Sequence, residues 1–265
     1  MFKPEACHSH FVYHAAQLPV LGESGQACLA GASVHISGLG RIGTGVALNL
    51  AAAGVGSISG NDPQMEEAEN IGPFLFCRPK DLGRPKVFVL EEFLHGRPGL
   101  IFEPLAEMTE SDLVDPYIAQ SDLVISCANT LSARLSAESK AIRMGKPVVQ
   151  VAVDDGSKFL GGMITLRLPQ NEWSACLGCY LENMPQFPRG EGLLTTATSV
   201  LAAIAANMAV ALLTGVRAEF LNSHNLFLVN LESYSIEALT VERRKECGVC
   251  GPVQRAVSAN HNQGV

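Results

Sequence analysis

The chain has 265 residues, 47% of them hydrophobic and 17% charged, and a formal net charge of −7 at pH 7. This apolar content is enough to bury a sizeable core in one domain, which excludes a disordered chain. A net negative charge provides no overall positive field for a polyanion, so nucleic acid is not expected as the main partner. We expect a single domain over residues 1–255, with an N-terminal arm at 1–30 and a loose tail at 256–265.

The cellular compartment decides whether the eight cysteines are read as disulfide partners or as free thiols. The first residues, MFKPEACHSHF, contain no apolar run long enough for a secretory signal peptide, so we expect a cytoplasmic protein. In a reduced cytosol, closely spaced cysteines are candidate metal ligands or catalytic groups, not disulfide partners.

The first part of the chain alternates predicted strands with predicted helices. A strand is predicted over 32–37, the sequence GLGRIG follows at 38–43, and a helical pattern continues to residue 53. Further strands are predicted over 57–59, 100–104, 123–127 and 148–153, and helices over 86–95, 111–119 and 132–144, with a loop through 70–83. This alternation favours a Rossmann-like, doubly wound α/β fold with a mostly parallel sheet.

After Gly161 the pattern changes. Longer strands are predicted over 163–168, 225–230 and 236–243, which indicates a C-terminal antiparallel extension of the sheet. Residues 193–216 carry no charge and are long enough to cross a bilayer. Their Thr, Ser and Asn content and the lack of a flanking basic cluster favour instead a helix buried on all sides, so no membrane partner is expected.

The glycine turn predicts a nucleotide site. Gly38, Gly40 and Gly43 let backbone amides approach a phosphate at the positive end of a helix, and Asp62 lies about twenty residues further on, where an acid accepts from a ribose hydroxyl. The turn alone does not identify the nucleotide, and an NAD-dependent oxidoreductase remains an open alternative at this point.

Two Cys-x-x-Cys pairs predict a metal site: Cys176 with Cys179, and Cys247 with Cys250. Each pair can present two thiolates to one tetrahedral Zn²⁺ ion. Four buried free cysteines would leave the paired spacing unexplained. Four thiolates close the coordination sphere, so the zinc would be structural.

The sequence resembles ThiF/MoeB/HesA proteins, relatives of the ubiquitin-activating enzymes. The resemblance is carried in order by GESGQACLAGASVHISGLGRIGTGVALNLAAAGVG, ENIGPFLFCRPKDLGRPK, MGKPVV, CLGC and LTVERRKECGVCG. It implies an adenylyltransferase that binds ATP and Mg²⁺ and converts the C-terminal carboxylate of a small carrier protein or peptide to an acyl-adenylate. A homodimer is also implied.

The resemblance assigns roles to particular residues. Lys86 would neutralise phosphate charge, and Asn129 stands where relatives have the aspartate that holds magnesium. The residues implied to bind the nucleotide are Gly38, Gly40, Gly43, Asp62, Asn70 and Lys86.

The sequence also departs from the family pattern. Pro73 stands where relatives have an arginine that contacts the phosphates, and Asn129 brings no charge to the metal. Gln64 replaces a second acid near the ribose, and residues 184–196 contain no cysteine for a thioester step. Two hypotheses therefore stay open: an adenylating enzyme, and a family member that kept the scaffold and now presents a peptide or nucleotide to a partner enzyme.

Overall fold

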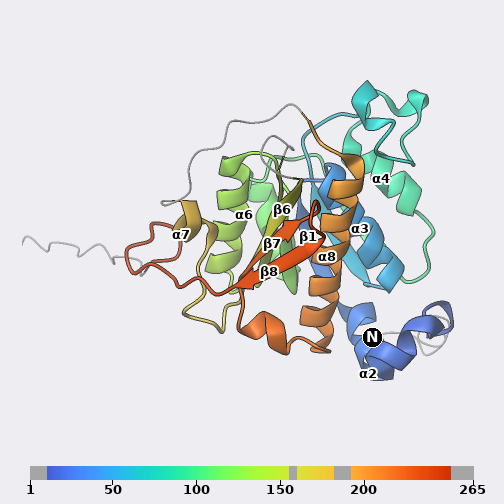
Figure 1. Cartoon of the computed structure of the whole chain (residues 1–265). Coiled ribbons are helices and arrows are strands. Elements are labelled where there is room, and N and C mark those ends of the chain that lie inside the picture. Colours follow the sequence, from blue (N-terminus) through green and yellow to red (C-terminus); the bar gives the residue numbers. More distant parts are fainter. Residues whose placement is uncertain (1–10, 155–159, 182–191, 252–265) are drawn as a thin grey trace, which may run out of the picture.

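The computed structural model describes residues 11–154, 160–181 and 192–251, and these contain one eight-stranded sheet (Figure 1). The strand order is β3-β2-β1-β4-β5-β6-β7-β8. Strands β1 to β5 are parallel, and β6, β7 and β8 are antiparallel to their neighbours. The strands are β1 (Ser33–Ser37), β2 (Ser57–Asn61), β3 (Ile101–Leu105), β4 (Leu123–Ser126), β5 (Val148–Val153), β6 (Gly161–Arg167), β7 (Leu226–Asn230) and β8 (Ser235–Leu239). The expected fold class is confirmed.

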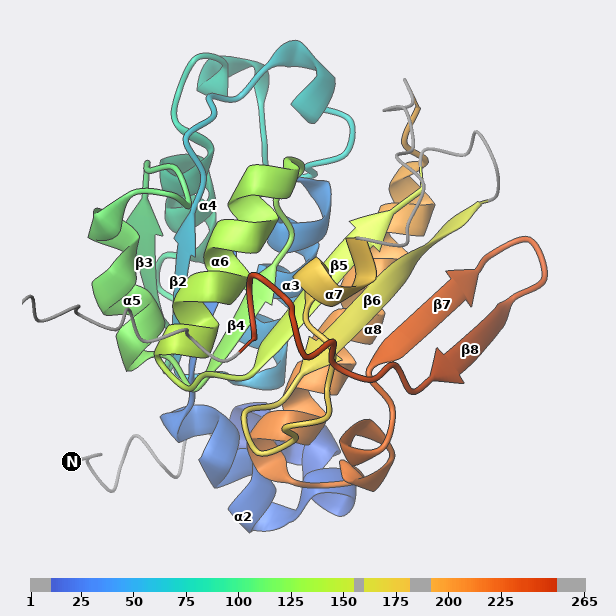
Figure 2. The same cartoon turned by 90° about the vertical axis from the view of Figure 1, so that its left-hand side faces the viewer.

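Helices cover both faces of the sheet. Helices α3 and α8 lie on one face, and α5 and α6 lie on the other (Figure 2). The α-helices are α2 (Leu18–Gly31), α3 (Arg41–Ala53), α4 (Lys86–Leu94), α5 (Asp115–Gln120), α6 (Leu131–Arg143), α7 (Leu177–Leu181) and α8 (Thr195–Thr214). The short 3-10 helices are η1 (Ala15–Gln17), η2 (Ala68–Asn70), η3 (Pro79–Asp81), η4 (Asp112–Val114) and η5 (Glu219–Asn222).

The two faces of the central strands differ in polarity. Side chains alternate along a strand, so Val34 and Ile36 of β1 join the apolar core under α3 and α8. His35 and Ser37 point to the opposite face, toward α5 and α6, where they are fully buried. A buried polar layer thus lies beneath α5 and α6, and an apolar one beneath α3 and α8.

Helix α8 corrects one prediction. Within the described residues it is the one helix long and apolar enough to cross a membrane, with a mean hydropathy of 1.8. It packs against α3 and α2, but only 44% of its most apolar window is buried. Val200 remains 41% exposed, so the prediction of burial on all sides is wrong for the single chain. The reason is that α3, α2 and the sheet cover one side of α8 only.

The N-terminal arm and the helix expected over 111–119 add detail to the predicted elements. The described part of the N-terminal arm contains helix α2, which is kinked at Gly22. The helix expected over 111–119 divides into η4 and α5, because Pro116 lies in the first turn of α5 and has no N–H to continue the preceding turn. The expected tail at 256–265 lies outside the described residues.

The strand expected over 236–243 is β8, which ends at Leu239. The side chain of Asn225 accepts from Val241 N and donates to Val241 O, both at 2.8 Å, and this turns the chain away from β7. Glu242 then bridges to Ser174. This detour brings the C-terminal Cys-x-x-Cys pair to the first one.

Candidate functional site

A cavity of about 210 Å³ opens at the carboxyl ends of β1, β2 and β4. The strand order reverses between β1 and β4, and ligands of open α/β sheets bind at such a switch point. The segment that follows β2 passes over the same edge of the sheet (Figure 2). The cavity is lined by Gly38, Gly40, Asn61, Asp62, Pro63, Gln64, Met108, Thr109, Glu110, Cys127, Ala128, Asn129, Thr130 and Ala133.

The floor of the cavity is the turn between β1 and α3. Gly38 has φ +87°, a conformation that favours glycine, and a Cβ there would lie 2.7 Å from Ala128 N. Gly40 caps α3, and Thr130 caps α6 by accepting from Ala133 N. Neither helix has an acidic residue in its own first turn, and the positive ends of both helix dipoles are directed at this cavity.

Two glycines of this turn provide a matched test. A Cβ at Gly43 would overlap the carbonyl oxygen of Gly38, whereas a Cβ at Gly40 would meet nothing within 4 Å. We expect Gly43→Ala to lower the free energy of unfolding by roughly 1–3 kcal/mol, because backbone must move. Gly40→Ala should cost less than about 1 kcal/mol. Urea denaturation measures both, and equal stabilities would show that the close approach is absent.

Asp62 connects the glycine turn to the segment after β2. Its Oδ2 accepts from Leu39 N and its Oδ1 from Gln64 N, each at 2.9 Å. Burial raises the pKa of this carboxyl, while the N–H of Gln64, the charge of Lys86 and the N–H of Leu39 oppose the rise. The acid expected to contact a ribose therefore also holds two backbone segments of the cavity wall.

Lys86 lies behind the cavity wall. Its N–H donates to Gln64 O at 3.0 Å and its Nζ donates to Gln64 Oε1 at 2.8 Å. Glu66 is 2% exposed. Burial raises the pKa of its carboxyl, and the charge of Lys86 opposes that rise. One side-chain amide thus separates the Lys86 ammonium from the cavity.

The structure brings together some of the residues assigned by resemblance. Gly38, Gly40, Asp62 and Asn129 line the cavity. Gly43 lies beneath the turn in α3, Asn70 is buried in η2, and Lys86 reaches the cavity wall through Gln64; none of these three lines the cavity itself.

Sequence reasoning missed three loop residues of the cavity wall, Met108, Thr109 and Glu110. They lie in the loop after β3, and the carboxyl ends of parallel strands meet at one edge of the sheet. The common edge of the strands could have predicted that this loop lies at the cavity, but the residue types of the loop indicate no role there.

A chain of buried hydrogen bonds lies under the cavity. His35 Nδ1 contacts Ser59 Oγ at 2.9 Å and His35 Nε2 contacts Asn61 Oδ1 at 3.2 Å, so both ring nitrogens of this core histidine have partners. Burial lowers the pKa of His35 from 6.5 to about 4, more than the hydrogen bond to Asn61 raises it. The imidazole is therefore neutral near pH 7.

His35 predicts a pH dependence of stability. The unfolded chain binds a proton at the ordinary pKa of 6.5 and the folded chain only near 4, so the unfolded state binds more protons between these values. The contribution of neutral His35 to the free energy of unfolding should be fully present above pH 6.5. It should fall by about 3 kcal/mol as the pH decreases from 6.5 to about 4. In His35→Gln that component of the slope should disappear. Parallel slopes of unfolding free energy against pH in both proteins would contradict the assignment.

Two buried thiols outside the Cys-x-x-Cys pairs have raised pKa values. Burial raises the pKa of Cys127, which lines the cavity, to about 12, and burial also raises the pKa of Cys77. A thiol reacts as the thiolate, so these shifts disfavour reaction of either group near neutral pH.

The four cysteines of the two Cys-x-x-Cys pairs form one buried cluster. Their sulfur atoms all lie within 4.8 Å of one another. The Sγ separations are 3.8 Å for Cys176 and Cys179, 3.6 Å for Cys176 and Cys247, and 3.5 Å for Cys179 and Cys250. Tetrahedral zinc with Zn–S distances of about 2.3 Å requires sulfur separations of about 3.8 Å. The donor set and its spacing fit zinc.

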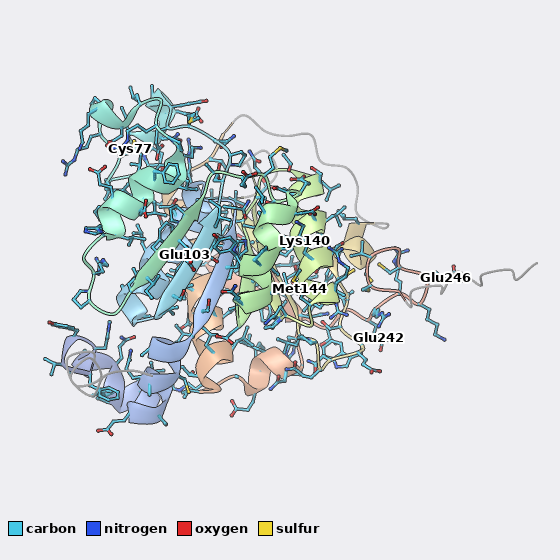
Figure 3. All side chains as sticks on the ribbon, turned by 180° about the vertical axis from the view of Figure 1, so that it is seen from behind. Cys77, Glu103, Lys140, Met144, Glu242 and Glu246 are labelled. Carbon is cyan, nitrogen blue, oxygen red and sulfur yellow. The ribbon has the colours of Figure 1, made fainter. Side chains whose placement is uncertain are left out.

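Backbone groups surround this cluster. Arg244 N donates to Cys179 Sγ at 3.4 Å, and Leu177 N donates to Glu138 Oε2 of α6 at 2.7 Å. Figure 3 shows the loop with Cys77 and the C-terminal segment with Glu242 and Glu246 on opposite sides of the molecule. The cluster, which contains Cys247 next to Glu246, therefore lies away from the loop with Cys77.

A mostly parallel sheet with a glycine-turn cavity at its switch point is an arrangement that nucleotide-binding α/β proteins share. The model of the ThiF family matches residues 13–249, so the chain belongs to the ThiF family.

Relatives match almost the whole chain. It is 29% identical to "Protein HesA, heterocyst" of Trichormus variabilis, over 88% of this chain and 85% of that one. It is also 29% identical to the "Sulfur carrier protein adenylyltransferase" of Thermus thermophilus, over 92% of each chain. The "Sulfur carrier protein ThiS adenylyltransferase" of Escherichia coli is 26% identical, over 86% of this chain and 89% of that one.

A solved structure supports the fold. The crystal structure of Escherichia coli MccB with ATP aligns with a TM-score of 0.72 at 19% identity, covering 90% of this chain and 73% of that one. At this identity the likeness shows a shared fold.

Proposed function

We propose that this chain is an ATP-dependent adenylyltransferase that activates the C-terminal carboxylate of a small carrier protein or peptide. The observation that carries the proposal is the cavity at the switch point, where the glycine turn and Asp62 lie together in a chain of the ThiF family. Two relatives are named as adenylyltransferases of sulfur carrier proteins. One MccB structure contains ATP and another the peptide MccA.

The electrostatics of the cavity support a nucleotide whose phosphates lie near its mouth. Asp62 and Glu110 line the cavity, and no lysine or arginine is among the described residues that line it. The enclosed volume of about 210 Å³ is below the roughly 300 Å³ of small ligand pockets, so part of the ligand must extend outside. The N-termini of α3 and α6 provide the positive potential, and Lys86 lies behind Gln64.

In the proposed reaction a carboxylate oxygen of the carrier attacks the α-phosphorus of ATP. The new bond is the acyl–phosphate bond, the bond from the α-phosphorus to the bridging oxygen breaks, and pyrophosphate leaves with that oxygen. The protein must hold two anions together during this displacement. In this proposal the backbone amides of the glycine turn and Lys86, behind Gln64, would do so. Asn129, which lines the cavity, would ligate magnesium through its neutral amide oxygen.

We also propose that the cysteine cluster holds one zinc ion in a structural role. The four sulfur atoms are buried, and four thiolates leave no coordination position for a substrate. The N–H groups of Cys250 and Val249 lower the pKa of Cys247 to about 6 against the effect of burial, which favours a thiolate before any metal binds.

One observation favours a second function. The Lys86 ammonium donates a hydrogen bond to Gln64, so it is already engaged with the cavity wall and not directed at a phosphate. With Pro73 and Asn129 in place of charged residues, a chain of this kind can keep nucleotide binding and lose turnover. It would then act as a scaffold that presents a nucleotide or peptide to a partner enzyme.

Pyrophosphate exchange separates the two functions. Purified protein is incubated with ATP, magnesium, labelled pyrophosphate and candidate carrier peptides that end in a free carboxylate. Label should enter ATP only when a peptide with a free C-terminus is present, and the same peptide with an amidated C-terminus is the control. Nucleotide binding without exchange, across the carrier proteins encoded nearby, would favour the scaffold.

A further inference from the structure

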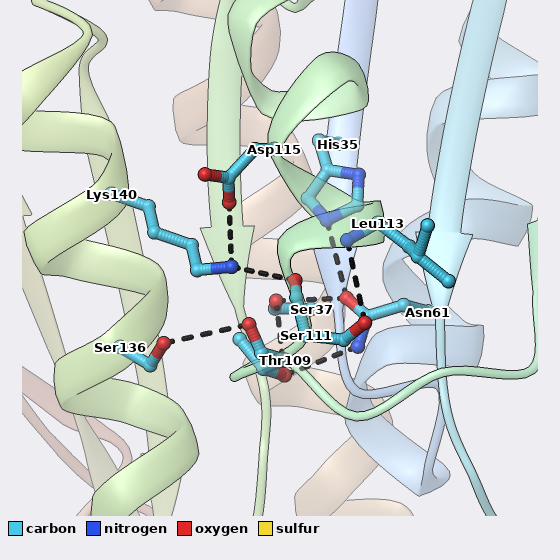
Figure 4. Close-up of polar contacts among 9 residues, drawn as sticks. All are labelled: His35, Ser37, Asn61, Thr109, Ser111, Leu113, Asp115, Ser136 and Lys140. Atoms are coloured by element: carbon cyan, nitrogen blue, oxygen red, sulfur yellow. Dashed lines mark hydrogen bonds and ion pairs between the residues drawn. The ribbon is translucent and has the colours of Figure 1, made fainter.

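One wall of the cavity is a loop without regular secondary structure. Met108, Thr109 and Glu110 line the cavity between the end of β3 and the start of η4. Loops at binding sites are commonly mobile because few hydrogen bonds hold them. Here side chains from β2 and from α6 hold the loop from both sides (Figure 4).

From β2, Asn61 uses its full hydrogen-bonding capacity. Its Nδ2 donates to Glu107 O at 3.0 Å and to Thr109 Oγ1 at 3.1 Å. Its Oδ1 accepts from Ser37 Oγ at 3.0 Å and from His35 Nε2 at 3.2 Å. An amide oxygen only accepts, so His35 carries its proton on Nε2, and the orientation of the Asn61 amide is fixed.

From α6, two side chains hold the other end of the loop. Lys140 Nζ donates to Ser111 O at 2.7 Å and forms an ion pair with Asp115 Oδ1 at 2.5 Å. Ser136 Oγ donates to Thr109 O at 3.4 Å. Lys140 is 4% exposed, and a lysine is seldom buried to this degree without a specific partner.

We propose that Asn61 and Lys140 are positioning residues for the nucleotide, which clamp residues 107–111 between β2 and α6 and fix the width of the cavity before the nucleotide binds. The inference rests on the proposed function. Helix α6 also begins at the cavity with Thr130 and Ala133, so the clamp joins two of its walls. A wall ordered during folding does not have to be ordered again on binding, which favours affinity.

Lys140→Met tests the clamp, because Lys140 does not line the cavity and acts on the nucleotide only through the loop. Lys146→Met is the matched control, since Lys146 also lies outside the lining. Calorimetry with ATP and magnesium should give roughly 10- to 100-fold weaker binding for Lys140→Met and unchanged binding for Lys146→Met. In pyrophosphate exchange the KM for ATP should rise with little change in kcat.

A second pair of variants covers the case in which Lys140→Met does not fold. Thr109→Ser keeps the hydroxyl that accepts from Asn61, whereas the isosteric Thr109→Val removes it. We expect ATP to bind roughly tenfold more weakly to Thr109→Val than to wild type, and Thr109→Ser to recover most of that loss. Wild-type protein that binds ATP, with Lys140→Met and Thr109→Val both folded and binding equally well, would overturn the clamp alone. Wild-type protein that binds no ATP would overturn the proposed function, and the clamp with it.

Discussion

Cys247→Ser should unfold the protein in milder conditions than any surface substitution, with a loss of roughly 4 kcal/mol or more of unfolding free energy. Metal binding to four thiolates contributes folding energy directly, because the site does not exist in the unfolded chain. Here the cluster joins α7 to the segment after β8, which the Ser174 bridge to Glu242 and the hydrogen bonds between Asn225 and Val241 also hold. Elemental analysis and thermal unfolding of wild type and variant measure the effect.

Cys28→Ser is the matched control for the zinc prediction. Cys28 is exposed on α2 and lies outside the cluster, so its zinc content and melting temperature should equal those of the wild type. The wild type should contain about one zinc per chain, and a chelator should lower its melting temperature. A fully folded, metal-free wild type with the same stability as the zinc-loaded protein would contradict the site.

Lys86→Met should reduce pyrophosphate exchange by roughly 10²- to 10³-fold, the usual cost of removing one group that stabilises developing charge. Lys86 is the lysine bonded to the cavity wall, and its backbone is fixed to Gln64 at the start of α4. Lys80→Met is the matched control: Lys80 is 59% exposed and pairs with Glu92 at the surface. It should exchange at the wild-type rate.

Loss of Lys86 could also unfold the protein, because its charge opposes the rise in the pKa of Asp62 and Glu66 that burial causes. The effect on exchange must therefore be separated from loss of folding. Thermal unfolding of each variant provides that check, and Lys86→Arg, which keeps the charge, should recover part of the activity. A folded Lys86→Met protein that exchanges as fast as wild type would show that Lys86 takes no part in the reaction.

The elements of the doubly wound sheet could be predicted because their signals are local. A glycine turn directly after an apolar strand, and alternating strands and helices, specify the first half of the fold. The cysteine cluster could be predicted because each Cys-x-x-Cys pair places two thiols on one short turn. Only the tertiary structure shows that the two pairs, far apart in the sequence, lie together.

The clamp could not be predicted, because its contacts are not local. Asn61 and Thr109 are 48 residues apart, and neither residue type identifies the other as a partner. The exposed face of α8 was missed for a related reason: the helix carries no charge on any side, and composition does not tell which side the sheet covers.

The account depends most on the cavity at the ends of β1, β2 and β4 binding ATP. Calorimetric titration of the purified chain with ATP and magnesium, and separately with NAD, tests this directly. We predict saturable binding of one ATP per chain that is tighter than the binding of NAD. Tighter binding of NAD, or no binding of ATP by folded, zinc-loaded protein, would contradict the account.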